Sequence, residues 1–210
     1  MHGDRHRLDP RLDRIAAGEA AALGEVFESY RPWLRRMIRL RLDRRLQGRV
    51  DPSDILQEAF LDISRRAVEQ ARSRDMPFFL WLRLMTGQKL LEVHRRHLGA
   101  QLRDATREVT LYSGALPQAS SLSLAAFLMG RQSSASHAAQ RAELQLRLQE
   151  VLNNMGPLDR EVLALRHFEE LTNNEVAQVL GITATAASNR YVRALERLKD
   201  ILAEIPAFQE

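Results

Sequence analysis

Six polar residues near the end of the chain have the types and the spacing for reading DNA. Three short hydrogen-bonding side chains come first and three arginines follow, within a stretch of helical periodicity: Thr185, Ser188, Asn189, Arg190, Arg193 and Arg197. Hydroxyl and amide groups can hydrogen-bond base edges in the major groove, whereas guanidinium groups commonly bind phosphates. We therefore expect base contacts from the first three residues and backbone contacts from the arginines.

The stretch from 171 to 199 supplies the two helices that such a site needs. Thr172 and Glu175 have the spacing of a capping box, and Gly181 follows where a helix commonly ends in a left-handed residue. Thr183 provides a second cap, after which apolar residues recur at helical spacing: Ala187, Tyr191, Ala194, Leu195, Leu198 and Leu202. This pattern predicts a helix-turn-helix, whose second helix enters the major groove. The alternative is an ordinary helical hairpin inside an all-α domain.

A row of acidic residues marks a second candidate site in the first half of the chain. The sequence DPSD at residues 51–54 predicts a helix start, and Asp54, Glu58 and Asp62 then recur every four residues. Like charges at this spacing weaken an isolated helix by roughly 0.2 to 0.5 kcal/mol per pair. In an arginine-rich domain this row, with Gln57 beside it, indicates a docking surface for a basic partner. Internal ion pairing with neighbouring arginines is the alternative.

Aromatic residues and cations are interleaved shortly before residue 100. Three aromatic residues precede three cations here: Phe78, Phe79, Trp81, Lys89, Arg95 and Arg96. Such a composition is used to stack unpaired bases while the cations hold the backbone. The alternative places two of the aromatic residues in the core, because an apolar face continues through Val93. The preceding segment, from Ala67 to Asp75, is polar and basic, has no aromatic residue and is expected to be a connector.

No constellation in the sequence indicates catalysis or a bound metal. Glu92, His94 and His97 lie near one another, but the arginines around them would repel a cation. Glu92 and His94 would also point away from each other on a helix. We find no nucleophile with an adjacent base and no glycine-rich phosphate loop. The sequence therefore predicts a protein that is not an enzyme and needs no cofactor.

Composition predicts a helical, cytoplasmic protein with no membrane span. The 210 residues are 45% hydrophobic and 28% charged, and they include no cysteine, which suits a reducing compartment. Residues 1–103 hold 21 Lys and Arg against 14 Asp and Glu, hence +7, whereas residues 104–210 hold 10 against 13, hence −3. Two contacts with polyanions, one in each half, would explain this asymmetry. A solvated arginine-rich surface is the alternative.

The hydrophobic periodicity divides the chain into four parts. A basic tail, residues 1–17, precedes a helical domain, residues 18–103, that begins with a long amphipathic helix over 18–42. Residues 104–140 are rich in Ser and Ala and are expected to form a flexible linker. Residues 141–210 form the helix-turn-helix domain. The expected fold is all-α, with two small helical domains joined by the linker.

The order of these segments resembles a bacterial sigma factor of the extracytoplasmic-function (ECF) group, the minimal two-domain members of the sigma-70 family. The resemblance runs from about Gly18 to Leu202 and is carried by three motifs: DPSDILQEAF (51–60), FFLWLRLMTGQKLLEVHRR (78–96) and GPLDREVLALRHFEELTNNEVAQVLGI (156–182). It implies a region 2-like domain over 18–103, a region 4-like domain over 141–210, and a transcription initiation factor that directs core RNA polymerase to specific promoters.

The resemblance also assigns a partner to each candidate site. It implies that the acidic face binds the clamp helices of the polymerase β′ subunit, through Asp54, Gln57, Glu58 and Leu61. It implies that the aromatic and cationic segment opens the minus-ten promoter element and captures an unstacked base, through Phe79, Trp81, Gln88, Lys89, Arg95 and Arg96. The six residues named at the outset would read the minus-thirty-five element. The polymerase β flap and an anti-sigma factor are further implied partners.

The sequence departs from the family pattern at a few positions. Gln88 stands where Asn is frequent, and Ala186 and Ala187 replace a common Thr-Val pair. A helix-turn-helix regulator that acts without core polymerase is the alternative function. Such a regulator would need a dimer interface and would not need the acidic row.

Overall fold

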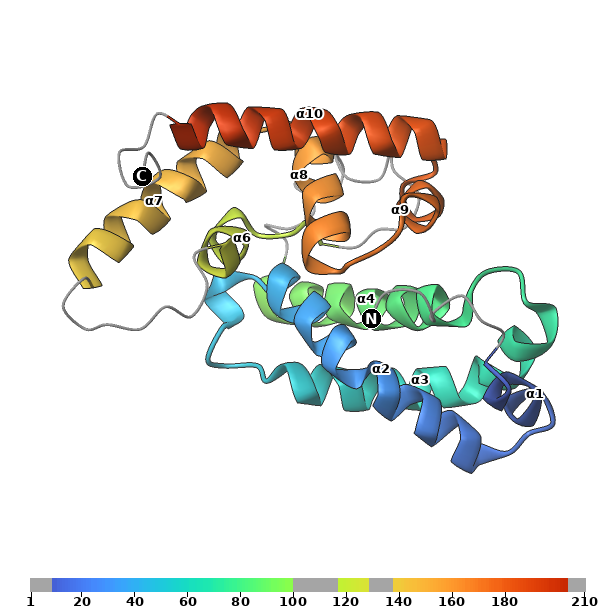
Figure 1. Cartoon of the computed structure of the whole chain (residues 1–210). Helices are drawn as coiled ribbons and strands as arrows, with labels where there is room; N and C mark the ends of the chain where they lie inside the picture. Colours follow the sequence, from blue (N-terminus) through green and yellow to red (C-terminus); the bar gives the residue numbers. More distant parts are fainter. Residues whose placement is uncertain (1–8, 100–116, 129–137, 204–210) are drawn as a thin grey trace. The chain divides into compact units, whose positions relative to one another are not determined.

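The chain folds into two compact helical units, Met1–Pro117 and Gln118–Glu210. The computed structural model describes residues 9–99, 117–128 and 138–203. All the regular elements in these described ranges are helices, as Figure 1 shows. The expected all-α class is confirmed.

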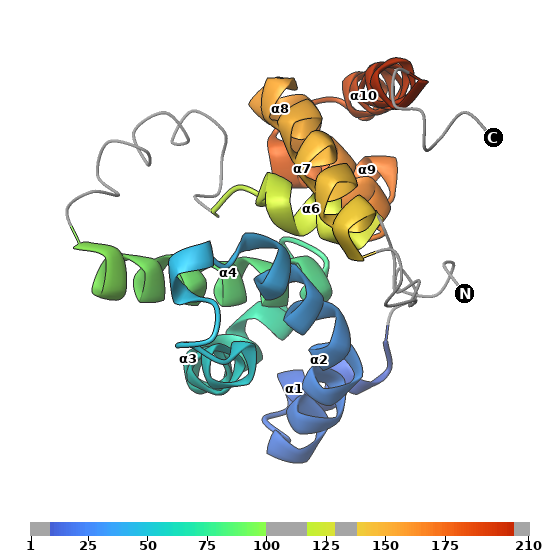
Figure 2. The ribbon, with the colours of Figure 1, turned by 90° about the vertical axis from the view of Figure 1, so that its left-hand side faces the viewer.

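The first unit is built around one long helix, α3, which packs against the three other α-helices of the unit. Its elements are α1 (Arg11–Ala16), α2 (Ala20–Arg41), the 3₁₀ turn η1 (Arg44–Leu46), α3 (Pro52–Ser73) and α4 (Phe78–Leu98). Their shared core consists of aliphatic side chains with almost no exposed surface, among them Leu34, Ile38, Ile55, Ile63, Leu82 and Leu90. Figure 2 shows α2, α3 and α4 from a second direction.

Helix α3 begins as expected but is longer than expected. The Asp51 carboxylate accepts a hydrogen bond from the Ser53 amide at 2.7 Å, and Pro52 occupies the first turn. The helix then continues to Ser73, so most of the expected connector from Ala67 to Asp75 is helical. Ala67 and Ala71 are buried one turn apart, and this packing outweighs the polar composition of the segment. The chain leaves the helix through Arg74, which has a left-handed conformation.

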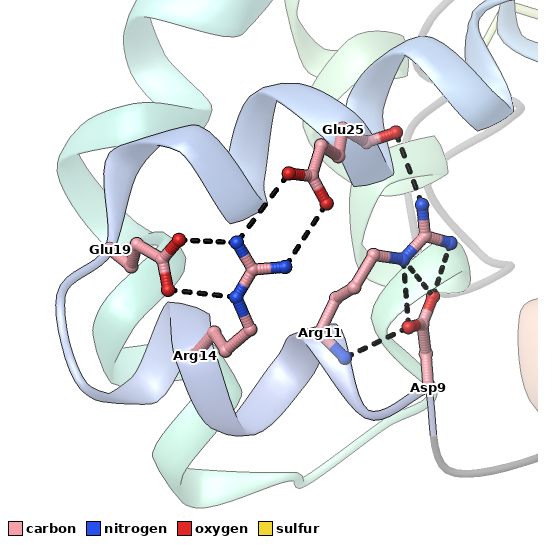
Figure 3. A network of polar contacts seen from close by, with 5 residues as sticks. All are labelled: Asp9, Arg11, Arg14, Glu19 and Glu25. Carbon is pink, nitrogen blue, oxygen red and sulfur yellow. Dashed lines mark hydrogen bonds and ion pairs between the residues drawn. The ribbon is translucent and has the colours of Figure 1, made fainter.

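The expected N-terminal tail also contains a helix, α1, with a buried Ile15. Figure 3 shows the polar contacts that hold α1 near the start of α2. The Arg14 guanidinium pairs with Glu19 and Glu25, and Arg11 pairs with Asp9. A polar tail sequence can thus become an ordered element when its charges find partners on a neighbouring helix.

Two further contacts join α1 to the end of α3. Arg72 donates a hydrogen bond to the Ala16 carbonyl at 2.9 Å, and Arg74 pairs with Asp13. These residues lie far apart in the sequence, so no local pattern predicts the contacts.

The second unit carries the helix-turn-helix and is larger than expected. Its elements are α6 (Ser121–Leu128), α7 (Ala138–Asn154), α8 (Pro157–Leu163), the π-helical turn η4 (Ala164–Phe168), α9 (Asn173–Leu180) and α10 (Ala184–Ala203). Helix α6 packs against α7 and buries Leu124 and Ala125. The structure therefore differs from the expected linker over 104–140, because 118–128 belongs to this unit. The linker positions 104–116 and 129–137 lie outside the described residues.

Two side chains of α8 hold the segment before α6 in place. The Arg160 guanidinium donates hydrogen bonds to Ser121 Oγ at 3.1 Å and to the Leu152 carbonyl at 3.0 Å. The Glu161 carboxylate accepts one from the Ala119 amide at 3.3 Å. No helix in the described part of the chain has the length and apolar character needed to cross a bilayer.

Candidate functional site

The helix-turn-helix is formed by α9, a tight turn and α10. Thr172 Oγ1 accepts a hydrogen bond from the Glu175 amide at 3.3 Å, and Glu175 Oε2 accepts one from the Thr172 amide at 2.6 Å. Gly181 ends α9 with a left-handed φ of 65°. Thr183 Oγ1 then accepts a bond from the Ala186 amide at 3.1 Å and caps α10. Both predicted caps, the capping box and the glycine turn are confirmed.

The start of α10 presents polar side chains away from the core. Thr185, Asn189 and Arg193 are exposed at successive four-residue intervals, so they lie on one face of the helix. Ser188 is half-buried beside them. Ala187 and Ala194 are fully buried on the opposite side. Hydrogen-bonding groups and a cation therefore share the outward surface of the second helix.

The two other arginines of the expected DNA surface have partners inside the unit. Asp159, in the first turn of α8, places Oδ2 3.1 Å from the Arg197 guanidinium and Oδ1 3.6 Å from that of Arg190. The Asp159 side chain is only 13% exposed. Sequence reasoning overlooked Asp159, because an acidic residue in a first helical turn is common and carries no sign of a distant partner.

A cation–π contact fixes a neighbouring point of α10. The Arg166 guanidinium carbon lies 5.0 Å from the centre of the Tyr191 ring, and Arg166 also donates a hydrogen bond to the Leu171 carbonyl. Arg166 belongs to η4, a π-helical turn of the kind often found near functional sites. The contact joins the segment before α9 to the second helix of the motif.

In the first unit, the outward face of α3 combines acidic, amide and apolar groups. Asp54 and Gln57 are exposed, Glu58 is partly exposed, and Leu61 keeps 60% of its surface open. The opposite face of the same helix is fully buried. A leucine of this exposure among polar residues is a typical feature of a protein-docking surface.

The inner carboxylates of the acidic row form ion pairs with α4. Asp62 lies 2.7 Å from Lys89 Nζ, and Glu58 lies 3.5 Å from the Arg96 guanidinium. Glu92 contacts both cations, at 2.7 and 3.2 Å. The hydrogen bond from Lys89 lowers the pKa of Asp62, and that from Asp62 raises the pKa of Lys89. Asp54 has no ion pair among the described residues, so the alternative of internal pairing holds for only part of the row.

The two expected stacking residues of α4 lie in the core instead. Phe79 is 2% exposed and Trp81 is 7% exposed. The Phe79 ring centre lies 6.0 Å from that of Trp33 and 6.1 Å from that of Tyr30, both on α2. Helix α4 is apolar on most of its circumference, so its first turns are surrounded by the rest of the unit. We therefore leave Phe79 and Trp81 out of the proposed DNA surface.

Two polar residues of α4 remain available. Gln88 and Arg95 are exposed and lie two helical turns apart on one face. Lys89 and Arg96 lie next to them but are held by the carboxylates of α3 and α4. His94 is buried, and its Nε2 accepts a hydrogen bond from the Asp43 amide at 3.2 Å. The described residues contain no group of acidic or histidine side chains suited to a metal ion.

These features define the class of the protein before any comparison: a two-unit helical protein with a capped helix-turn-helix. Comparison with known proteins agrees. The family model described as "Sigma-70, region 4" matches residues 145–198. The ECF RNA polymerase sigma factor SigD of Mycobacterium tuberculosis is 30% identical over 200 residues, covering 95% of this chain and 85% of that protein, and the Mycobacterium bovis SigD matches equally. The chain belongs to the ECF sigma factors, as the motifs predicted.

Two further matches are shorter or more distant. The RNA polymerase sigma-E factor of Streptomyces coelicolor is 38% identical over 55 residues, or 26% of this chain and 31% of that protein. The solved structure of CnrH, in complex with the cytosolic domain of CnrY, aligns with a TM-score of 0.54 at 20% identity. That alignment covers 93% of this chain and 96% of CnrH, and it shows a shared fold. Family membership makes this chain a transcription initiation factor.

Proposed function

We propose that this initiation factor binds core RNA polymerase through the outward face of α3 and reads promoter DNA separately with α4 and α10. The observation that carries the proposal is the exposed face of Asp54, Gln57 and Leu61 on a helix whose other side is completely buried. An accessible apolar side chain with acidic neighbours suits a basic protein partner. The β′ clamp helices are the proposed partner of this face.

The DNA-reading part of the proposal rests on the exposed polar residues of two helices. In the first unit, Gln88 and Arg95 are available to single-stranded minus-ten DNA. In the second unit, Thr185, Ser188 and Asn189 are proposed to read minus-thirty-five base edges, and Arg193 to bind the adjacent phosphates. The proposal gives no direct DNA contact to the ion-paired cations Lys89, Arg96, Arg190 and Arg197.

Further partners enter by analogy with the relatives. CnrH was solved with the cytosolic domain of CnrY, which supports a proposal that a protein of the anti-sigma kind also binds this chain. We extend the proposal to the polymerase β flap as a partner of the second unit. A factor with these partners would act in the cytoplasm.

The test of the polymerase contact is a charge and shape change on α3. Replacing Asp54 and Leu61 together by Ala and Ser should reduce binding to core polymerase at least tenfold, because a central apolar contact and a neighbouring charge are lost. Co-purification and fluorescence anisotropy with labelled full-length protein measure the loss.

A matched control removes charge elsewhere. Glu69→Ala with Asp75→Ala takes two exposed carboxylates from the far end of α3 and the following turn, and should leave binding to core polymerase unchanged. Circular dichroism should show the same helix content for all variants. Unchanged binding by the Asp54 and Leu61 variant would refute the proposed docking face.

A further inference from the structure

Asp159 is a nearly buried carboxylate of the second unit that the function proposed above does not use. It lies in the first turn of α8, where the helix dipole favours a negative charge. Its two oxygens approach two different arginines of α10, Arg197 at 3.1 Å and Arg190 at 3.6 Å. Because these arginines are seven residues apart, they lie on the same face of α10, two turns from each other. One carboxylate thus engages two cations of the DNA-reading helix.

We propose that Asp159 is a specificity-determining residue, which keeps Arg190 and Arg197 away from DNA phosphates. This inference rests on the proposed reading of minus-thirty-five DNA by α10. With the two guanidinium groups held against α8, the helix meets DNA through Thr185, Asn189 and Arg193, which point away from the core. Base-reading groups then contribute a larger share of the contacts.

The physical reason lies in what a phosphate contact contributes. Contacts with phosphates strengthen binding to every sequence alike and carry no direct sequence information. Each one adds about 0.9 to the slope of log affinity against log salt concentration. Two additional free arginines on the reading helix would therefore raise affinity for unrelated DNA, which is present in great excess over promoters.

The geometry favours a lasting restraint over a chance surface pair. The Asp159 side chain is 13% exposed and that of Arg190 is 33% exposed, so water competes poorly for this contact. The Arg197 side chain is more open, at 58%, but it donates a hydrogen bond to Asp159 Oδ2. A purely structural role, in which Asp159 only joins α8 to α10, makes a different prediction for DNA binding.

The experiment compares full-length variants in holoenzyme reconstituted with core polymerase. A preferred minus-thirty-five duplex is first selected from a random library, and a scrambled duplex serves as the non-specific probe. Asp159→Asn, which keeps the shape but removes the charge, should steepen the salt slope by about 1 to 2 as one or two arginines are freed. It should also lower the ratio of specific to non-specific affinity.

Two further variants separate the roles. Asp159→Glu keeps the charge and should retain the wild-type slope. Arg190→Gln with Arg197→Gln should leave the slope unchanged beside a native Asp159, but should reverse the steepening when added to Asp159→Asn. This second pair of measurements does not depend on the stability of the Asp159 variants by themselves.

Two results would overturn the inference. One is that Asp159→Asn weakens both probes equally at an unchanged slope, as a structural role requires. The other is that the arginine pair already lowers the slope beside native Asp159, which would show that the arginines contact phosphates. Holoenzyme that prefers no duplex sequence at all would instead contradict the proposed minus-thirty-five reading.

Discussion

At the residue scale, the charge of a side chain and its availability are separate properties in this protein. Lys89 and Arg96 in the first unit, and Arg197 in the second, have carboxylate partners. Arg95 and Arg193 are exposed and have no ion pair among the described residues. Counting arginines along the sequence therefore overestimates the cations that can meet DNA.

A buried histidine predicts how the stability of the first unit depends on pH. His94 is 3% exposed, and burial lowers its pKa below the ordinary value of 6.5, against the opposing attraction of Asp43. The unfolded chain therefore binds a proton more readily than the folded chain as pH falls below 6.5. Stability should be retained above that pH and lost as pH falls toward the folded pKa, by at most about 1.4 kcal/mol per pH unit.

The two tryptophans make this loss measurable. Trp33 and Trp81 both lie in the first unit, so tryptophan fluorescence during urea unfolding reports on that unit alone. His94→Gln offers an uncharged acceptor for the Asp43 amide and should flatten the change between pH 7 and pH 5. An equally steep pH dependence in His94→Gln would exclude His94 as the cause.

At the element scale, local signals place the helices, and glycine provides a direct check. Gly24 lies inside α2, and an added Cβ atom would meet no other atom within 4 Å. Gly24→Ala should stabilise the first unit by about 0.5 to 1 kcal/mol, because alanine loses less backbone freedom on folding. The urea midpoint by tryptophan fluorescence measures the change.

The matched control has the same free space but a different backbone. Gly48 has a φ of 83°, and an added Cβ atom there also meets nothing within 4 Å. Gly48→Ala should destabilise the unit by roughly 1 kcal/mol, because alanine is strained in the left-handed region. Opposite signs for the two substitutions are required; a shared sign would contradict the description of one of these segments.

At the scale of the whole molecule, two separate units imply two separable DNA contacts. Gln88→Ala with Arg95→Ala should weaken binding of holoenzyme to single-stranded minus-ten DNA, and Asn189→Ala should weaken and relax recognition of the minus-thirty-five duplex by about 1 to 3 kcal/mol. Because the substituted residues lie in different compact units, their effects on a complete promoter should add to within about 0.5 kcal/mol.

Anisotropy with matched probes tests this separation. Arg39→Ala removes an exposed arginine of α2 and is the control for lost charge in the first unit. It should affect single-stranded binding less than the Gln88 and Arg95 pair. Strong non-additivity on the complete promoter would show that the two contacts are coupled.

The sequence by itself determined the fold class, the family and most helix positions, because the signals for these features are local. The caps at Asp51 and Thr172 and the turn at Gly181 depend on residues within one helical turn. The apolar periodicity of α2 and α10 needs only the order of residues along each helix. The motifs that identify the family are likewise continuous stretches of the chain.

Only the tertiary structure decided which candidate residues are accessible. Phe79 and Trp81 have the composition of a stacking surface, but the helices around α4 bury them. Asp159 and Arg197 are 38 residues apart, and their contact exists only because α8 packs against α10. Burial and ion pairing depend on distances between elements that are remote in the sequence, whereas a sequence pattern specifies the face of a helix but not what lies against it.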